Sequence, residues 1–505
     1  MSASRRLFIF LVALLLVGSL HSRVAKAQGP GGWSPDQQVP GYLDDTFTPL
    51  LVSDSHGVVH AFASQWVVNV YRRQAVVYRQ WTPWGGWTRP VDIILAPSGD
   101  AQILSAFLDA SDRMHLIFMA AEAGKSGVYY SIVPVEEADL AMAWSVPVLI
   151  GSGINLNSAV ILGDDRDHLF VIYSGNRSGN GVYFLESADS GSSWSDPEPV
   201  YLTYDVKLVA YSLRLAISNN EQLRAAWNVV TSVGVDELLY FANYEISSSK
   251  WDIPVELDSR LDLRDYFGPS FPAMTDNGNE IVIVYNTGNP FHDRPVDPGR
   301  PIQIVRFSRD NGKTWSSPFN PFPFHLGRSG EHALVLDSSG ASHCLFVQRT
   351  ERIASDGTYR ATGGLWHSTF KDGQWSNPDR FVPTYTPHDV RAVISQGNVL
   401  LAVWQEDPGI GEHGIWFSYR ILDTPALPTV PVSIAPASTP APGQAATITP
   451  SLNTPTSLPD DLLLDSRTPQ WMNSPAFPVI AGVTPVLLLV VSALLAYRYI
   501  HGRRE

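Results

Sequence analysis

The chain has 505 residues, of which 44% are hydrophobic and 17% are charged, and its formal net charge is −14. The hydrophobic content, with 15 Trp and 19 Tyr, suits a packed and β-rich protein. The acidic balance argues against a nucleic-acid partner and against general adhesion to anionic membranes. The single cysteine, Cys344, excludes an intrachain disulfide framework, and its apolar surroundings indicate a buried thiol.

Residues 1–27 have the features of an export signal. Arg5 and Arg6 precede an apolar run, and Ala25-Lys26-Ala27 offers small residues for cleavage before Gln28. An uncleaved membrane anchor is the alternative. Both interpretations place residues 31–423 outside the cytoplasm.

A tryptophan followed closely by a proline recurs along the chain at intervals of 50 to 64 residues. Each unit opens with an apolar strand, a polar turn and a second strand, as in 49–63 and 271–285. A period of this size with four short strands is typical of a β-propeller blade. The seven tryptophans are Trp33, Trp87, Trp144, Trp194, Trp251, Trp315 and Trp375.

Six complete repeats are followed by a seventh, about 386–423, that lacks its Trp-Pro strand. The strand around Trp33-Ser34-Pro35 has no repeat of its own, and adding it to the last blade would close the ring and cover an open sheet edge. The sequence therefore predicts an all-β fold, a β-propeller of seven four-stranded blades over residues 31–423 with closure by the N-terminal strand. A six-bladed ring is the alternative.

Two of the repeats carry a longer pattern, S-x-D-x-G-x-[ST]-W, at 187–194 and 308–315. We expect a turn in which the Asp accepts backbone N–H bonds, the Gly adopts positive φ and the Trp begins the next strand. The pattern resembles the Asp box, or bacterial neuraminidase repeat, of the sialidase superfamily and related propellers. The resemblance implies a structural role in the turn, and no chemistry, for Asp189, Gly191, Trp194, Asp310, Gly312 and Trp315.

The composition changes after Asp423. Residues 424–475 are rich in Pro, Thr, Ser and Ala, which predicts a disordered stalk. Residues 478–500 are nearly all apolar and long enough to cross a bilayer, and 501–505 follow with Arg503 and Arg504. The positive charges predict a cytoplasmic C-terminus, and hence a single-pass protein of the cell membrane with the propeller outside.

A ligand is expected on the face opposite the boxed patterns, where the longer loops lie. Arg214 and Arg391 each stand four residues before the end of an opening strand, so both should point to the central channel. Guanidinium groups bind carboxylates at two points, although ion pairs inside the channel would explain the same pattern. The links between blades add Tyr266, His388 and Asp389 as further ligand-binding candidates.

The resemblance to sialidases also implies what a catalytic site would need: axial arginines, a Tyr–Glu pair as nucleophile and an Asp as acid/base. The candidates are Tyr385 with Glu331, and Asp44 or Asp45 as the acid. No cofactor is expected. The loop with His292, Asp293 and Asp297 matches no strong metal-ligand spacing, so no metal is expected either.

Three functions fit these observations. The favoured one is a surface module that binds an extracellular glycan or protein, because the fold has support and a complete catalytic set does not. The alternatives are a sialidase-like glycoside hydrolase acting on acidic glycans and a structural propeller of the cell envelope. Nothing in the sequence indicates the oligomeric state.

Overall fold

The computed structural model describes residues 32–429, except for 43–44, 68–72, 96–99, 123–124, 219–221, 261–266, 289–301, 324, 327–330, 349–350, 354–355, 357–358, 361–362, 384–386 and 407–413. The predicted signal 1–27, nearly all of the stalk and the segment 478–500 lie outside the described residues. In the described part, no helix is both long and apolar enough to cross a membrane.

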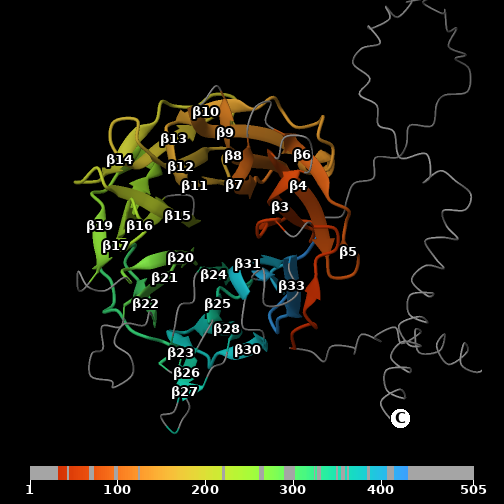
Figure 1. Cartoon of the computed structure of the whole chain (residues 1–505), viewed down its shortest axis with the longest axis vertical. Helices are drawn as coiled ribbons and strands as arrows, with labels where there is room; N and C mark the ends of the chain where they lie inside the picture. The colour runs from red at the N-terminus through yellow and green to blue at the C-terminus, as the bar shows by residue number, and fades with distance from the viewer. Residues whose placement is uncertain are drawn as a thin grey trace, which may run out of the picture. The chain divides into compact units, whose positions relative to one another are not determined.

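Seven antiparallel sheets follow one another around a ring in chain order (Figure 1). Their innermost strands contact one another in a closed circle, from β2 through β7, β11, β15, β20, β24 and β31 back to β2. The described chain is therefore a seven-bladed β-propeller. The strands of blades 1 to 3 are β2 (Leu50–Ser53), β3 (Val59–Val67), β4 (Arg73–Thr82), β5 (Gly86–Trp87) and β6 (Val91–Leu95); β7 (Ala101–Leu108), β8 (Arg113–Glu122), β9 (Lys125–Pro134) and β10 (Val148–Ser152); β11 (Ile154–Gly163), β12 (Leu169–Gly175), β13 (Gly181–Ser187) and β14 (Glu198–Leu202).

Blades 4 to 7 continue the pattern, and blade 7 takes its fourth strand from the N-terminus. A small extra sheet forms beside blade 6 from β23 (His325–Leu326), β26 (Glu351–Ile353) and β27 (Tyr359–Arg360). The blade strands are β15 (Leu208–Ser218), β16 (Gln222–Thr231), β17 (Asp236–Glu245), β18 (Lys250–Trp251) and β19 (Val255–Ser259); β20 (Ser270–Asp276), β21 (Ile281–Thr287) and β22 (Ile302–Ser308); β24 (His332–Leu336), β25 (Ser342–Gln348), β28 (Gly364–Lys371), β29 (Gln374–Trp375) and β30 (Asp379–Val382); β31 (Pro387–Ser395), β32 (Val399–Glu406), β33 (Gly414–Ile421) and β1 (Gln37–Gln38).

The outer strand of several blades is divided into two short pieces, because the proline of the Trp-Pro repeat has no N–H to give to the ladder. Pro90, for example, separates β5 from β6, and both pieces pair with β4. The Ser or Thr that follows six of the seven Trp residues restores the connection, whereas Trp251 is followed by Asp252. Ser145, for example, donates its N–H to Ile132 O at 2.9 Å, and Ser145 Oγ accepts from Ile132 N at 3.0 Å. The predicted Trp-Pro repeat thus corresponds to a recurring pair of hydrogen bonds, called here the stitch, between the third and fourth strands.

The N-terminal strand closes the ring as predicted. Gln37 and Gln38 pair with Phe417 and Trp416 of β33. Ser34 makes the same stitch as Ser145, donating its N–H to Tyr419 O at 2.8 Å and accepting from Tyr419 N at 2.9 Å. This closure confirms the predicted ring of seven blades over the six-bladed alternative.

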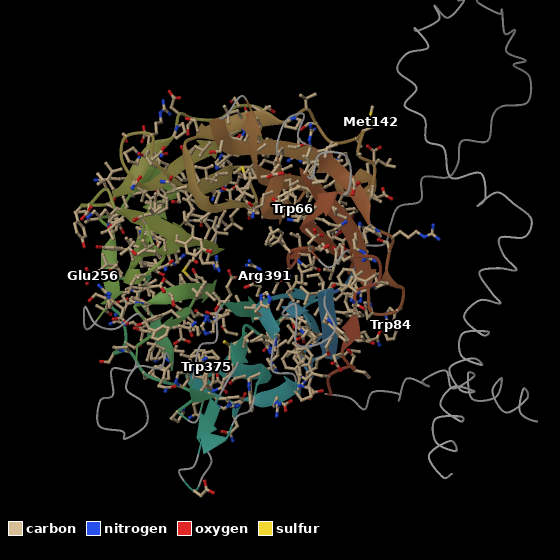
Figure 2. All side chains as sticks on the ribbon, viewed as in Figure 1. Trp66, Trp84, Met142, Glu256, Trp375 and Arg391 are labelled. Carbon is tan, nitrogen blue, oxygen red and sulfur yellow. The ribbon has the colours of Figure 1, made fainter. Side chains whose placement is uncertain are left out.

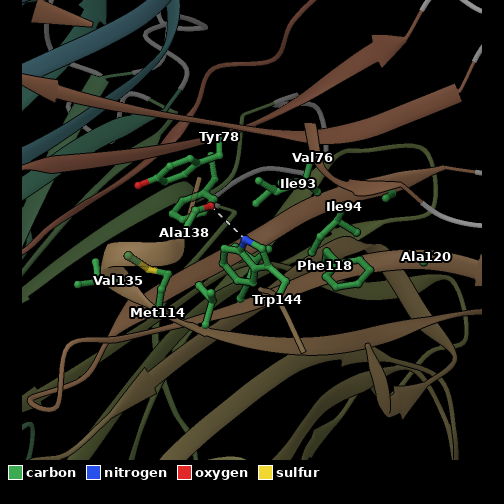
Figure 3. Close-up of a cluster of buried hydrophobic side chains, with 14 residues drawn as sticks. Val76, Tyr78, Ile93, Ile94, Met114, Phe118, Ala120, Val135, Ala138 and Trp144 are labelled. Carbon is green, nitrogen blue, oxygen red and sulfur yellow. Dashed lines mark hydrogen bonds between the residues drawn. The ribbon is translucent and has the colours of Figure 1, made fainter. Parts of the chain in front are cut away.

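The hydrophobic core is divided among the spaces between blades. Seven clusters of buried side chains fill the seven contacts between neighbouring blades. Figure 3 shows the one between blades 1 and 2, where Trp144 packs with Phe62 and Tyr78 and donates its indole N–H to Ala138 O at 3.1 Å. Because each blade buries both faces, the ring holds itself together without a single central core.

The segments 187–194 and 308–315, called here the boxed turns, adopt the same structure. In the second, Asp310 Oδ1 accepts from Thr314 N at 2.9 Å and Asp310 Oδ2 accepts from Thr314 Oγ1 at 2.6 Å. Gly312 has φ +78°, and a Cβ there would lie 2.4 Å from the Phe241 ring of the preceding blade. Both positive φ and close packing therefore require glycine at this position.

A second network recurs in blades 1, 2 and 6 on the same side of the ring, where the innermost strand ends. In blade 1, Asp54 Oδ1 accepts from two turn N–H groups, Asp54 Oδ2 lies 3.2 Å from His60 Nε2, and His60 Nδ1 lies 2.7 Å from the Tyr78 hydroxyl. Blade 2 repeats the chain with Asp109, His115 and Tyr130. Blade 6 has Asp337 and His343, but His367 takes the place of the tyrosine, with its Nε2 2.9 Å from His343 Nδ1. We call these networks the Asp–His chains. The side of the ring that carries them, together with the boxed turns, is called the box face.

The last described residues, up to Thr429, pack on the box face. Leu427 donates its N–H to Gln396 O at 2.7 Å, and Ser338 Oγ donates to Pro425 O at 2.6 Å. The chain that was expected to form a stalk from residue 424 therefore keeps contact with blades 6 and 7 for its first few residues.

Candidate functional site

A cavity of about 450 Å³ lies among the innermost strands and is called here the axial cavity. Its walls come from β2, β7, β11, β15 and β31, and from Glu331, which directly precedes β24. Figure 2 shows Arg391 near the middle of the ring, whereas Trp84, Met142 and Glu256 lie at its rim. Its charged lining side chains, with two that carry a hydroxyl group, are Arg214, Glu331, Asp389 and Arg391, and Tyr211 and Ser212.

The cavity lies away from the box face. Phe47 and Glu331 line it just before their innermost strands begin, whereas the boxed turns follow the ends of third strands. First and third strands run in the same direction, so their ends share one side of the ring. Contacts agree: Arg224, at the start of β16, donates to Asn311 in the second boxed turn at 3.0 Å.

A β-bulge brings each arginine into the cavity together with a neighbour from its own strand. The pairing register shifts between Tyr211 and Arg214 in β15, and between His388 and Arg391 in β31. Within the bulges, Ser212 has φ 48° and Asp389 has φ 52°. The extra residue reverses the alternation of side chains, so Tyr211 and Arg214, three positions apart, both line the cavity.

Serine hydroxyl groups from neighbouring blades accept hydrogen bonds from backbone N–H groups of the bulged strands. Ser158 Oγ of β11 accepts from Leu213 N, beside Arg214, at 3.3 Å. Ser64 Oγ of β3 accepts from Ile103 N at 3.0 Å in the same way. The bulges expose N–H groups that a regular ladder would have used, and these serine side chains satisfy them.

The two arginines differ in their electrostatic environment. Arg391 Nη2 lies 3.0 Å from Glu331 Oε2, although the N–H is not aimed at the oxygen and, among the described residues, neither this oxygen nor Arg391 Nε has a well-formed hydrogen bond. Arg214 Nη1 donates to Leu213 O at 2.9 Å, and Arg214 makes no ion pair within 4.0 Å with any described residue. Burial lowers the pKa of Arg214, and the negative charge of Glu331 opposes that shift.

Two further titratable groups lie close to Arg214. Burial raises the pKa of Tyr211, and the negative charge of Glu331 adds to the rise. His332 is buried, with Nδ1 3.3 Å from Phe271 O, and its burial lowers its pKa to about 4. Both groups are thus neutral at neutral pH.

The structure brings together four of the residues predicted from the sequence: Arg214, Arg391, Glu331 and Asp389 all line the cavity. His388 lies beside it, with Nδ1 3.0 Å from Asp389 Oδ2. Asp45 is described but does not line the cavity. The candidates Tyr385, Asp44 and Tyr266 lie outside the described residues.

Sequence reasoning missed Tyr211. In a regular strand a residue three positions before Arg214 would face the opposite side, and only the bulge at Ser212 turns it toward the arginine. A serine with positive φ carries no sequence signal, so this residue could not be found without the structure.

No group of three or more His, Cys, Asp or Glu side chains within the described ranges is arranged to hold a metal ion. The chemistry that the cavity offers is recognition of negative charge by arginine, with a phenol and carboxylates beside it.

No model of a known protein family matches the chain, and no curated protein matches it. Among solved structures, it is similar to a polysaccharide lyase of family PL25, an ulvan lyase bound to -[GlcA(1-4)Rha3S]-, with 10% identity and a TM-score of 0.50 over 79% of this chain and 96% of the lyase. It is also similar to the polysaccharide lyase Uly1 (9% identity, TM-score 0.48, 81% of this chain and 95% of the lyase). A third is the intramolecular trans-sialidase from Ruminococcus gnavus (11% identity, TM-score 0.39, 81% of this chain and all of the other). At these identities the likeness is one of fold alone.

Proposed function

We propose that this protein is a membrane-anchored, extracellular β-propeller that binds an acidic glycan in the axial cavity through Arg214 and Arg391. The observation that carries the proposal is the convergence of these arginines, from blades 4 and 7, on one cavity in which Arg214 lacks an acidic partner among the described residues.

A partly buried guanidinium such as that of Arg214, without a carboxylate paired to it, is unfavourable because the charge has lost part of its hydration. Either a protein carboxylate or a bound anion can compensate it, and Glu331 lies against Arg391. A ligand carboxylate or sulfate ester between the two arginines would receive charge-assisted hydrogen bonds from both.

The form of the site favours a sugar over a folded protein partner. A concave cavity of about 450 Å³ falls in the range of small-ligand pockets, whereas protein interfaces are broad. The wall formed by blades 1 to 3 presents Thr48, Gln102, Ser105 and Ser158 among apolar side chains. Such a wall offers partners for sugar hydroxyls and apolar contact for the faces of a sugar ring.

We also propose membership of the Asp-box type of propeller and attachment to the cell membrane. Two boxed turns with the same hydrogen bonds support the first proposal. The export-signal pattern in 1–27, the low-complexity stalk in 424–475 and the apolar run in 478–500 support the second. The chain leaves the propeller on the box face, so its first residues do not obstruct the axial cavity.

A sialidase-like glycoside hydrolase is the second candidate. It is favoured by the presence of Tyr211 and Glu331 in one cavity, close enough for the charge of Glu331 to raise the pKa of Tyr211. In this reading Tyr211 would replace Tyr385 as the partner of Glu331, and Asp389 would be the acid. Release of free acidic sugar by the wild type, lost in Tyr211→Phe, would establish the enzyme, and saturable binding without turnover would establish the receptor.

The proposal is tested by probing an array of neutral, carboxylated and sulfated glycans with the purified full-length protein. We expect binding to acidic glycans that free uronic acids compete for and that neutral sugars do not. Binding to neutral glycans alone, or to none, would contradict the proposal and would favour a structural role or a protein partner.

A further inference from the structure

The charged side chains at the axial cavity differ in how strongly each would act on a ligand. Two guanidinium groups, Arg214 and Arg391, face it, and Glu331 and Asp389 are its acidic side chains. How strongly each carboxylate counts depends on its own surroundings, because solvent and hydrogen-bond partners weaken its influence on a ligand.

Glu331 acts on the cavity at short range. Its side chain is 15% exposed, and Oε2 lies 3.0 Å from Arg391 Nη2. It also shifts the pKa of both Arg214 and Tyr211, so it is close to both arginines and to the phenol. Because water has little access to Glu331, solvent screens its charge only weakly toward a ligand in the cavity.

Asp389 is in a different position. Its side chain is 46% exposed, and its Oδ2 lies 3.0 Å from His388 Nδ1. Water and the His388 imidazole both lie against the Asp389 carboxylate and weaken its influence. Asp389 therefore contributes less to the electrostatic field at the arginines. Among the described residues, the charges that act on the cavity at short range are two positive and one negative.

We propose that Glu331 sets the charge of the ligand, so that the axial cavity accepts an acidic sugar with one negative charge and rejects one with two. This inference rests on the proposed function and specifies its ligand class. A single carboxylate or sulfate ester neutralises the charge that Arg214 leaves unmatched. A second negative charge would find no further cation among the described lining residues and would be repelled by Glu331.

Two sugars that differ in charge and share their shape test the inference. Glucose 6-sulfate and glucose 6-phosphate have the same ring and the same tetrahedral group, but the sulfate carries one negative charge and the phosphate close to two at neutral pH. Glucuronate is the planar single-charge acid and glucose the neutral control. Binding of each to the full-length protein is measured by calorimetry and by competition with an acidic glycan from the array.

We expect the wild type to bind glucose 6-sulfate and glucuronate at least about ten-fold more tightly than glucose 6-phosphate, as one unscreened like charge implies. Glu331→Gln keeps the shape and removes the charge, so it should tighten binding of the phosphate about ten-fold and erase most of the difference. Glu331→Asp keeps the charge and should keep the preference. Glu237→Gln, which removes a carboxylate 2.9 Å from Arg260 outside the cavity, should leave all affinities unchanged.

The outcomes separate this inference from the proposed function. Equal binding of sulfate and phosphate by the wild type, or an unchanged preference in folded Glu331→Gln, would overturn the role of Glu331 while anion binding stands. Absence of binding to every acidic sugar and glycan, in a protein with normal thermal unfolding, would overturn both.

Discussion

On the box face, polar side chains repeat from blade to blade and end in hydrogen bonds. Asp54 and Asp109 occupy the same place in their blades, each bonded to turn N–H groups and to a histidine that in turn meets a tyrosine. In the axial cavity, polar side chains belong to particular blades, and Arg214 has no carboxylate of its own among the described residues. The difference teaches that repeated, satisfied groups maintain this fold, and that the unrepeated, unsatisfied ones are where a ligand should bind.

The largest expected effect comes from opening the ring. Deleting residues 28–43 removes Ser34 and buried Val39, and also Trp33, whose ring stacks on Phe381 with centroids 3.9 Å apart. Strand β33 then loses its partner β1 and is left with an unpaired edge. We expect the melting temperature of the full chain to fall by about 10 °C or more, measured by calorimetry.

A deletion of equal length within the stalk, at 440–455, is the control and should leave melting unchanged. Unaltered melting of the 28–43 deletion would contradict closure by the N-terminal strand.

The second effect is a pH dependence that arises where an Asp–His chain departs from the repeat. The burial of His367, followed by the charges of His343 and Arg420, lowers its pKa to about 3, whereas an unfolded histidine titrates near 6.5. Between these values the unfolded state takes up a proton that the folded state refuses, so stability falls as pH decreases from about 6.5 to about 3. The slope is at most about 1.4 kcal/mol per pH unit.

His367→Tyr restores the residue found in blades 1 and 2 and should flatten this part of the stability curve, measured by urea unfolding across the acidic range. His332, whose pKa is also lowered, is present in both proteins and cancels in the comparison. Parallel curves for variant and wild type would show that His367 does not contribute to the acid sensitivity.

A smaller effect is expected from a boxed turn. Asp310→Ala removes the acceptor of the Thr314 N–H and hydroxyl bonds, so it should lower the melting temperature by less than the closure deletion. These bonds lower the pKa of Asp310 to about 2. The stabilisation they give is present above the unfolded value near 3.9 and is lost as pH falls toward 2, so wild type and variant should converge there.

Glycan binding by folded Asp310→Ala should equal that of the wild type. A large loss of binding with normal melting would place the ligand on the box face and would reverse the comparison made above.

The fold was predictable because its determinants are local and repeat. The Trp-Pro stitch, the turn glycines and the unpaired Trp33-Ser34-Pro35 strand all leave a pattern in the sequence, and they specify blade number and closure. The site was only partly predictable. Arg214 and Arg391 could be found by register because their bulges occur at the same distance from the strand end.

Other parts of the site depend on properties that no local pattern encodes. Tyr211 faces the cavity through the positive φ of Ser212, and the pairing of Glu331 with Arg391 joins different blades. The difference in electrostatic environment between the two arginines follows from such long-range contacts. The ligand charge could therefore be inferred only after the ring had been assembled.

The measurement that tests the central claim most directly is the affinity of Arg214→Ala for an acidic glycan that the wild-type protein binds. With the melting temperature unchanged, we expect a loss of at least about ten-fold, since a charge-assisted hydrogen bond of this kind contributes about 1.5–3 kcal/mol. Arg214→Lys should recover little of it, because lysine lacks the two parallel donors. Arg309→Ala, which removes an exposed arginine of the second boxed turn that pairs with Glu280, is the control and should bind normally. Wild-type affinity in folded Arg214→Ala would contradict the claim that this unmatched arginine makes the axial cavity an anion site.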